Sequence, residues 1–286
     1  MKTHTSVTVD KDQAVGYDKA GYFYSWFSYI ISIVFLFVPK ALLRKIIQLS
    51  HPAQRVVETA TTHEALELLY IEPNNHNSQK SSRSLTRFWF HLRNPKAVRN
   101  RLKLVKKLLK QNSEKKDHIR ILSLGAGSAR AVLETVKELE VINKTFEISL
   151  LDLNPLALKT SRELAISLGI KSRISFINEK LRADSNIFNN KFDIVEMVGL
   201  LDYLQDEKAR DVFLSVRKCL ELHGTFITCN ISNNIEKRFV AEIIDWKMKY
   251  RDGFQLVQML TDTGFSNAHV IYEPLRIHAV AIGEKS

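Results

Sequence analysis

The sequence predicts an α/β fold in which a mostly parallel sheet ends in an antiparallel hairpin and follows an α-helical N-terminal extension. Three observations lead to this prediction. Short apolar runs alternate with longer amphipathic segments from residue 118 onward, and such alternation is typical of a parallel sheet with helices between its strands. Glycines follow several of the amphipathic segments, where helices commonly end. The last two apolar runs are joined only by Glu273-Pro274-Leu275, a link too short for a parallel crossover.

Each expected element follows from its own run of residues. Short continuous apolar runs predict strands, at 119–124, 148–152, 173–177, 192–199, 225–231, 267–272 and 276–282. Helices are expected where apolar residues recur at helical spacing near a cap or a glycine, after residue 128 and at 154–168, 206–222, 236–250 and 254–263. The sheet is therefore expected to have seven strands.

The strand at 119–124 ends at two glycines, Gly125 and Gly127, and the next strand ends in a carboxylate, Asp152. A strand, a glycine turn, a helix and a second strand with a terminal acid form a nucleoside-binding half-site. A side chain at either glycine would hold a ligand away from the backbone, and Asp152 can accept hydrogen bonds from both hydroxyls of a ribose. The alternatives are an ordinary tight strand-to-helix turn at the two glycines and a helix cap at Asp152.

The glycine pattern excludes two other nucleotide sites. A dinucleotide turn has the pattern G-x-G-x-x-G, but position 130 is arginine. A phosphate-binding P-loop ends in G-K-[ST], which does not follow here. The spacing of histidines and acids offers no metal-ligand pattern either, so no metal is expected.

The run from residue 119 resembles the first motif of the class I S-adenosylmethionine methyltransferases, although Ser123 stands where that family usually has an acid and Ala129 where it has a third glycine. The segment FDIVEMVGLLDYL at 192–204 resembles the fourth motif, and QMLTDTGF at 258–265 resembles the turn before the hairpin. The resemblance covers residues 118–285. It implies a Rossmann-like, mostly parallel seven-stranded sheet with a C-terminal antiparallel hairpin, and S-adenosylmethionine as the cofactor.

The resemblance also implies where the cofactor would bind. Its methionine part would pass over the first loop, its ribose would meet the end of the second strand, its adenine would meet the end of the third strand, and its methyl group would lie over the end of the fourth. The residues at these places are, in that order, Gly125, Ala126 and Gly127; Asp152 and Leu153; Lys180 and Leu181; and Val198 and Gly199.

Candidates for the acceptor side follow the fourth motif and the helix expected at 236–250. We expect catalytic roles for Asp202, Tyr203 and Arg251, with Asn230, Trp246 and Tyr250 as further candidates. Arg251 is suited to hold a carboxylate through a bidentate pair. The alternatives are a surface arginine at 251, a core aromatic at 203 and a helix cap at 202. The phrases LSLGAGSAR and VGLLDYL and the Trp246, Tyr250 and Arg251 cluster resemble bacterial enzymes that methylate the carboxylate of hydroxy fatty acids.

The part before residue 118 divides by composition. We expect a polar leader at 1–21, a hydrophobic and helical region at 22–72, a polar linker at 73–84 and a basic helical segment at 85–117, before a cofactor-binding domain at 118–286. The run at 22–38 is uncharged, and its length is at the lower limit for crossing a bilayer. Basic residues follow it closely, which would place the catalytic region in the cytoplasm. The alternative is a buried helix that roofs the substrate pocket.

Charge is concentrated in one segment. The chain has a net charge of +11, and residues 80–120 contain 14 Lys and Arg residues against Glu114 and Asp117, so the remaining residues sum to −1. Asn94 is expected to cap a helix with Pro95 in its first turn, and its charges are expected on the outer face. That face would meet solvent, an anionic membrane or nucleic acid. Two cysteines fit a reducing compartment.

These patterns favour a methyltransferase that acts on a small, lipophilic acceptor, through a carboxylate or a hydroxyl, near a membrane. The expected location is the cytoplasm, with attachment to the cytoplasmic face of a membrane as one option. A non-catalytic scaffold with the same fold and an RNA methyltransferase are the alternatives, the second because of the basic segment. The sequence makes no prediction about oligomeric state.

Overall fold

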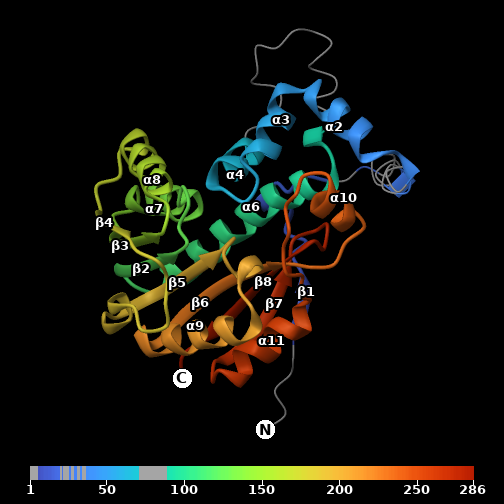
Figure 1. Ribbon diagram of the computed structural model, residues 1–286. Coiled ribbons are helices and arrows are strands. Elements are labelled where there is room, and N and C mark those ends of the chain that lie inside the picture. Colours follow the sequence, from blue (N-terminus) through green and yellow to red (C-terminus); the bar gives the residue numbers. More distant parts are fainter. Residues whose placement is uncertain are drawn as a thin grey trace.

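The computed structural model describes residues 6–19, 21, 26, 29–30, 33, 37–70 and 89–286. One sheet of eight strands has the order β1-β7-β8-β6-β5-β2-β3-β4. Its strands are β1 Ser6–Val9, β2 His118–Leu124, β3 Thr145–Asp152, β4 Arg173–Asn178, β5 Phe192–Val198, β6 Leu220–Ile231, β7 Ser266–Tyr272 and β8 His278–Glu284. Neighbouring strands are parallel except where β8 pairs with β6 and β7. The predicted α/β class with a C-terminal antiparallel pair is confirmed (Figure 1).

Helices cover both faces of the sheet (Figure 1). They are α2 Lys40–Gln48, α3 His51–Glu58, α4 His63–Tyr70, α6 Arg93–Ser113, α7 Arg130–Glu140, α8 Pro155–Leu168, α9 Asp206–Cys219, α10 Lys237–Glu242 and α11 Gly253–Asp262, with short 3-10 turns η1 Gln13–Val15, η3 Asn186–Asn189 and η4 Leu201–Tyr203. Strand β2 shows how the two faces are filled. Ile119 and Ile121 pack in one core with residues of α6 and α7, whereas Leu122 and Leu124 pack in the other with residues of α9 and α11.

Caps set the bounds of several helices where the sequence predicts them. The Asn154 side chain accepts a hydrogen bond from the Leu156 backbone N–H at the start of α8, and Gly169 ends that helix in the left-handed conformation. Asp252 and Gln255 form a reciprocal capping box at the start of α11. These local signals determine where α8 and α11 begin and where α8 ends.

Two expected helices are shorter than predicted. Helix α9 ends at Cys219, because Leu220 is already extended and pairs with Phe192 of β5. The helix expected at 236–250 is reduced to α10, because the chain turns at Asp245 with a φ of 57°. The backbone N–H of Lys249 then donates to the Asp202 carbonyl instead of continuing a helix.

The segment expected as a polar leader contributes a strand to the sheet, so the sheet has one strand more than the seven predicted. Residues Ser6–Val9 form β1, which pairs in parallel with the edge strand β7 and makes an eighth strand. Beyond β1, the chain carries three acids to helix α6. The Asp18 carboxylate lies 2.5 Å from Arg99 and 2.7 Å from Lys103. Asp10 and Asp12 lie 2.7 Å and 3.0 Å from Lys107.

These contacts also correct the prediction for the basic segment. Helix α6 begins at Arg93 with Leu92 as its N-cap, not at Asn94. Lys96, Arg99 and Arg101 are buried rather than on an outer face. The sequence missed this because the acids that pair with the helix lie about eighty positions away or on α7. Arg99 and Arg101, on which the RNA alternative partly depended, are therefore not on an exposed surface.

The described N-terminal helices α2, α3 and α4 form a third cluster with the segment after β6. Leu43, Ile47 and Val56 pack there with Phe239 and Trp246. Together they stand over the end of the sheet at which β5 finishes (Figure 1). Within the described ranges, no helix is long and apolar enough to cross a bilayer. The linker expected at 73–84 and most of the segment expected at 22–38 lie outside the described residues.

Candidate active site

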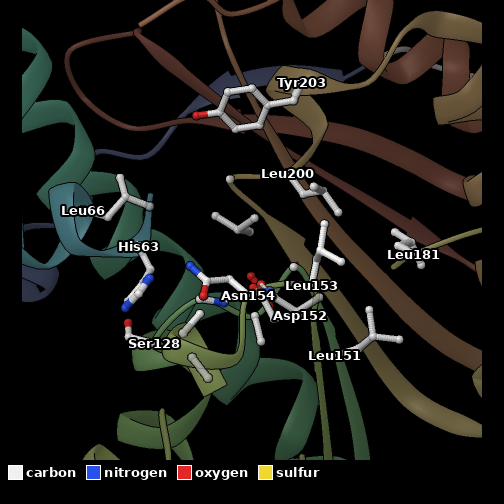
Figure 2. A pocket seen from close by; sticks show the side chains of 18 of the residues that line it. His63, Leu66, Ser128, Leu151, Asp152, Leu153, Asn154, Leu181, Leu200 and Tyr203 are labelled. Atoms are coloured by element: carbon white, nitrogen blue, oxygen red, sulfur yellow. Dashed lines mark hydrogen bonds between the residues drawn. The ribbon is translucent and has the colours of Figure 1, made fainter. Parts of the chain in front are cut away.

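A cavity of about 680 Å³ lies at the carboxyl ends of β2, β3, β4 and β5. The chain leaves β2 toward β3 on one side, whereas β5 leads toward β6 on the other. Such a reversal of strand order opens a crevice between the loops, and ligands of open α/β sheets bind there. Figure 2 shows side chains from separate segments of the chain converging on this space, among them His63, Asp152, Leu181 and Tyr203.

The first loop presents bare backbone to the cavity. Gly125 and Gly127 have φ values of 64° and 56°, in the left-handed region that favours glycine. A Cβ atom on Gly125 would lie 3.0 Å from Leu200 Cβ, and one on Gly127 would lie 3.4 Å from His63 Cβ. Ala129 keeps the left-handed conformation, with a φ of 52°, at the position where the related motif has its third glycine.

Asp152 lies at the end of β3 and faces the same cavity (Figure 2). Its Oδ2 accepts a hydrogen bond from the Gly127 N–H and its Oδ1 accepts one from the Asn154 N–H, both at 2.8 Å. It is not the cap of α8, because Asn154 fills that role. Each carboxylate oxygen keeps a further acceptor site. A carboxylate beside a bare glycine loop fits the ribose and methionine parts of a nucleoside cofactor.

The structure brings the other expected cofactor residues to this cavity. Its wall includes Ala126, Leu153, Lys180, Leu181, Val198 and Gly199. Four different strands position them, since each residue lies at or just after the end of β2, β3, β4 or β5. The sequence could bring them together because the carboxyl ends of parallel strands meet at one edge of a sheet.

A second, largely apolar cavity of about 100 Å³ adjoins the first. The two share Leu66, Arg101, Gly199, Tyr203 and Trp246 in their walls. Helices α2, α3 and α4 supply apolar side chains to the second cavity, including Ile47, Val56 and Leu69. Within the described residues, α2–α4 therefore form a roof over this second cavity.

Asp202 lines the second cavity, and Tyr203 lines both cavities. The Trp246 indole N–H donates to the Tyr203 hydroxyl oxygen at 2.6 Å. Burial raises the pKa of Tyr203 to about 12, so its hydroxyl is protonated at neutral pH. The Asp202 carboxylate lines the second cavity and accepts a hydrogen bond from the Ile231 N–H at 2.8 Å. Burial raises the pKa of Asp202 to about 6.

Arg251 lies elsewhere, which corrects the expectation that it anchors an acceptor. It is 3% exposed and lines neither cavity. Its guanidinium donates to the Asp206 carboxylate, to the carbonyls of Leu201 and Leu204, and to the Asn230 side chain. All its donating nitrogens are engaged within the fold, so Arg251 and Asn230 stabilise the loop after β5 instead.

The sequence analysis missed Arg101 of α6, which lies at the junction of the two cavities. Its side chain is 3% exposed, and its Nη2 donates to the Tyr70 hydroxyl at 3.3 Å. Its Nε has no partner, and it forms no ion pair with any residue that the structure describes. Buried arginines are normally paired. The signal was present in the sequence, since Arg101 falls at helical spacing between the buried Val98 and Val105.

The sequence analysis also missed Glu196 of β5, a carboxylate in an otherwise apolar strand. It is 6% exposed and lines the larger cavity. The Ser123 hydroxyl, at the end of β2, donates to its Oε2 at 2.5 Å. Burial raises the pKa of Glu196 to about 7. A charged residue within a central strand was the signal that could have found it.

Helix α4 contacts the residues that follow the glycines of the first loop. The Glu67 carboxylate accepts a hydrogen bond from the Ser128 hydroxyl and forms an ion pair with Arg130. Next to it, the His63 Nε2 lies 3.1 Å from the Thr160 hydroxyl. The roof and the cofactor loop are thus joined by side chains of opposite charge.

Comparisons with known proteins agree with this geometry. The family model described as a methyltransferase domain matches residues 115–275, more than half of the chain. No curated protein matches the chain significantly in sequence. A possible exported protein from Bordetella parapertussis is similar over 84% of this chain and 85% of its own, with 14% identity and a TM-score of 0.67. Magnesium protoporphyrin IX methyltransferase from Synechocystis, solved with bound SAH, is similar over 66% of this chain and 85% of its own, with 11% identity and a TM-score of 0.53. At these identities, the two structures show a shared fold.

Proposed function

Because the chain belongs to the methyltransferase domain family and uses S-adenosylmethionine as its cofactor, we propose that it methylates a small, lipophilic acceptor whose carboxylate binds Arg101. One observation supports this proposal above the others. A buried guanidinium without an ion-pair partner among the described residues lies where the cofactor cavity meets an apolar cavity. An acceptor with a carboxylate head and an apolar body matches both features.

Methyl transfer requires the protein mainly to position the acceptor against the cofactor. Bound S-adenosylmethionine supplies an electrophilic methyl group. A carboxylate is ionised at neutral pH and needs no general base. Arg101 would orient it, while Leu66 and Trp246 between the cavities would exclude water. The Tyr203 hydroxyl accepts from Trp246, so its own proton is left to donate to the acceptor.

A hydroxyl acceptor is the second candidate, because Asp202 lines the apolar cavity and titrates near pH 6. An alcohol needs a base, and a carboxylate whose pKa is raised toward neutrality suits that task. The two candidates differ in their pH dependence. With an alcohol, the rate should fall as the pH drops through about 6 and Asp202 becomes protonated. With a carboxylate, the rate should not follow this titration.

An acceptor panel tests the proposal. The full chain is incubated with methyl-labelled S-adenosylmethionine and either a long-chain carboxylic acid, the primary alcohol of equal length or a short RNA. We expect label in the methyl ester of the acid. Label in the alcohol that is lost in Asp202→Asn would favour the hydroxyl candidate, and label in RNA would overturn both. Cofactor binding without transfer to any acceptor would favour the scaffold alternative.

We also propose contact with a membrane surface, near which a lipophilic acceptor would be found. Large apolar side chains are exposed on the described part of the N-terminal region, with Trp26 62% and Phe37 82% accessible. Exposed Arg44 and Lys45 follow on α2. Aromatic residues next to basic residues are typical of helices that lie in a membrane interface.

Vesicle flotation checks this expectation. The wild-type chain should float with vesicles that contain anionic lipid, and Trp26→Ser with Phe37→Ser should reduce the bound fraction several-fold, because each substitution removes apolar burial. Phe254→Ser on α11 is the matched control, since Phe254 is also exposed but lies outside this region. Equal flotation of all three proteins would exclude the N-terminal surface as the contact.

A further inference from the structure

Ser123 stands where the related motif usually has an acid, and a carboxylate is found on the adjacent strand instead. Ser123 of β2 and Glu196 of β5 are register partners in the parallel ladder. Both are buried, and the serine hydroxyl donates to the glutamate at 2.5 Å. Ser123 immediately precedes the loop that contains Gly125. Because the partners are adjacent across the sheet, a carboxylate on β5 reaches nearly the same place as one on β2.

The charge of Glu196 is only partly compensated by the protein. Its hydrogen-bond donors are the Ser123 hydroxyl and the Val198 N–H, both uncharged. Arg101 of α6 acts on it at longer range, and the Cys229 thiol of β6 lies within range of its charge. A buried carboxylate is costly unless a cation meets it. Glu196 lines the cofactor cavity, so a cationic group of the ligand can supply that charge.

The position of Glu196 indicates which cationic group this is. Asp152 at the end of β3 is the proposed ribose contact, and Val198 and Gly199 at the end of β5 are the proposed floor for the methyl group. The amino acid part of the cofactor then crosses the junction of β2 and β5, above Gly125. We infer that Glu196 binds the α-ammonium group of the cofactor, with Ser123 as a positioning residue that holds the carboxylate. This inference rests on the proposed placement of S-adenosylmethionine.

The inference carries a dependence on pH. The pKa of Glu196 is raised to about 7 by burial, so part of the unliganded protein is protonated there at neutral pH. The ammonium group favours the ionised form and lowers that pKa, so binding releases a proton below neutrality. Cofactor affinity should therefore rise as the pH increases from about 6 to about 8.

Two ligands distinguish the contact between Glu196 and the ammonium group from the rest of cofactor binding. S-adenosylhomocysteine carries the α-ammonium group but no sulfonium charge, whereas methylthioadenosine lacks the whole amino acid part. In Glu196→Gln, which keeps the size and the hydrogen-bond acceptor, the calorimetric affinity for S-adenosylhomocysteine should fall by about 10- to 100-fold, as for loss of a charged hydrogen bond. The affinity for methylthioadenosine should not change, and the pH dependence should disappear. Glu147→Gln, on an exposed position of β3, is the control.

An exchange of the two side chains provides a second measurement. Ser123→Asp with Glu196→Ser moves the carboxylate to β2 and should recover most of the affinity for S-adenosylhomocysteine that Glu196→Gln loses. Equal weakening of both ligands in Glu196→Gln, or an affinity that does not change, would overturn the inference. Binding of neither ligand by the wild-type chain would overturn the placement of the cofactor itself, which is a distinct result.

Discussion

Replacement of Arg101 by methionine should abolish most acceptor methylation while changing the cofactor affinity far less. Methionine keeps the apolar volume of the side chain but cannot pair with a carboxylate. Loss of a buried, charged contact to a substrate costs about 3 kcal/mol, so kcat/KM for the acceptor should fall by about 10²-fold or more. Because Arg101 has only one hydrogen bond within the described chain, the melting temperature should change little. Steady-state kinetics with the acid identified in the panel, together with calorimetry of the cofactor, measure both effects.

Arg251→Met provides the matched control, because both arginines are 3% exposed. Arg251 donates to four residues, and its removal leaves several buried acceptors unpaired. The free energy of unfolding should therefore fall by about 3 kcal/mol or more. Arg101→Met should thus lose acceptor methylation with little change in stability, whereas Arg251→Met should lose stability. If Arg101→Met retained full acceptor turnover, the carboxylate proposal would fail.

Gly127→Trp should reduce S-adenosylmethionine binding by more than about 10²-fold. The backbone at Gly127 has a φ of 56° and faces His63, so an indole there must enter the cavity. Part of any effect will come from the strained backbone, which disfavours every side chain but glycine. Gly16→Trp isolates this part, since Gly16 has a φ of 67° and open space around it. Calorimetry should show binding only in the second variant, and binding in both would exclude the loop as the cofactor site.

The fold could be predicted because its signals are local. Asn154 and Gly169 bound α8 by their own conformations, and the short link after residue 272 allows only a hairpin. The missed elements depend on distant partners. Strand β1 exists because β7 offers it an edge, and α9 ends early because Leu220 pairs with β5. Nothing within either segment reports those neighbours.

The candidate site likewise contains residues whose positions the sequence could predict and residues whose roles it could not. The glycine loop and Asp152 could be expected to meet, since strand ends converge in a parallel sheet. Arg101 and Glu196 could not be placed, because their roles depend on what surrounds them after folding. A charge within a buried stripe or a central strand marks both positions. Only the structure shows that Arg101 has no ion-pair partner among the described residues, whereas Arg251 is fully bonded.

The contact between Glu67 and the loop residues Ser128 and Arg130 has a consequence for turnover. Methyl transfer leaves a thioether nucleoside behind, and His63 and Leu66 of α4 form part of the wall of the cavity proposed to hold it. We expect release of that nucleoside to require this ion pair to break. Where such an opening is slow, departure of the spent nucleoside limits the rate instead of the chemistry. The purified enzyme should then carry that nucleoside with it, and added salt should speed its exchange.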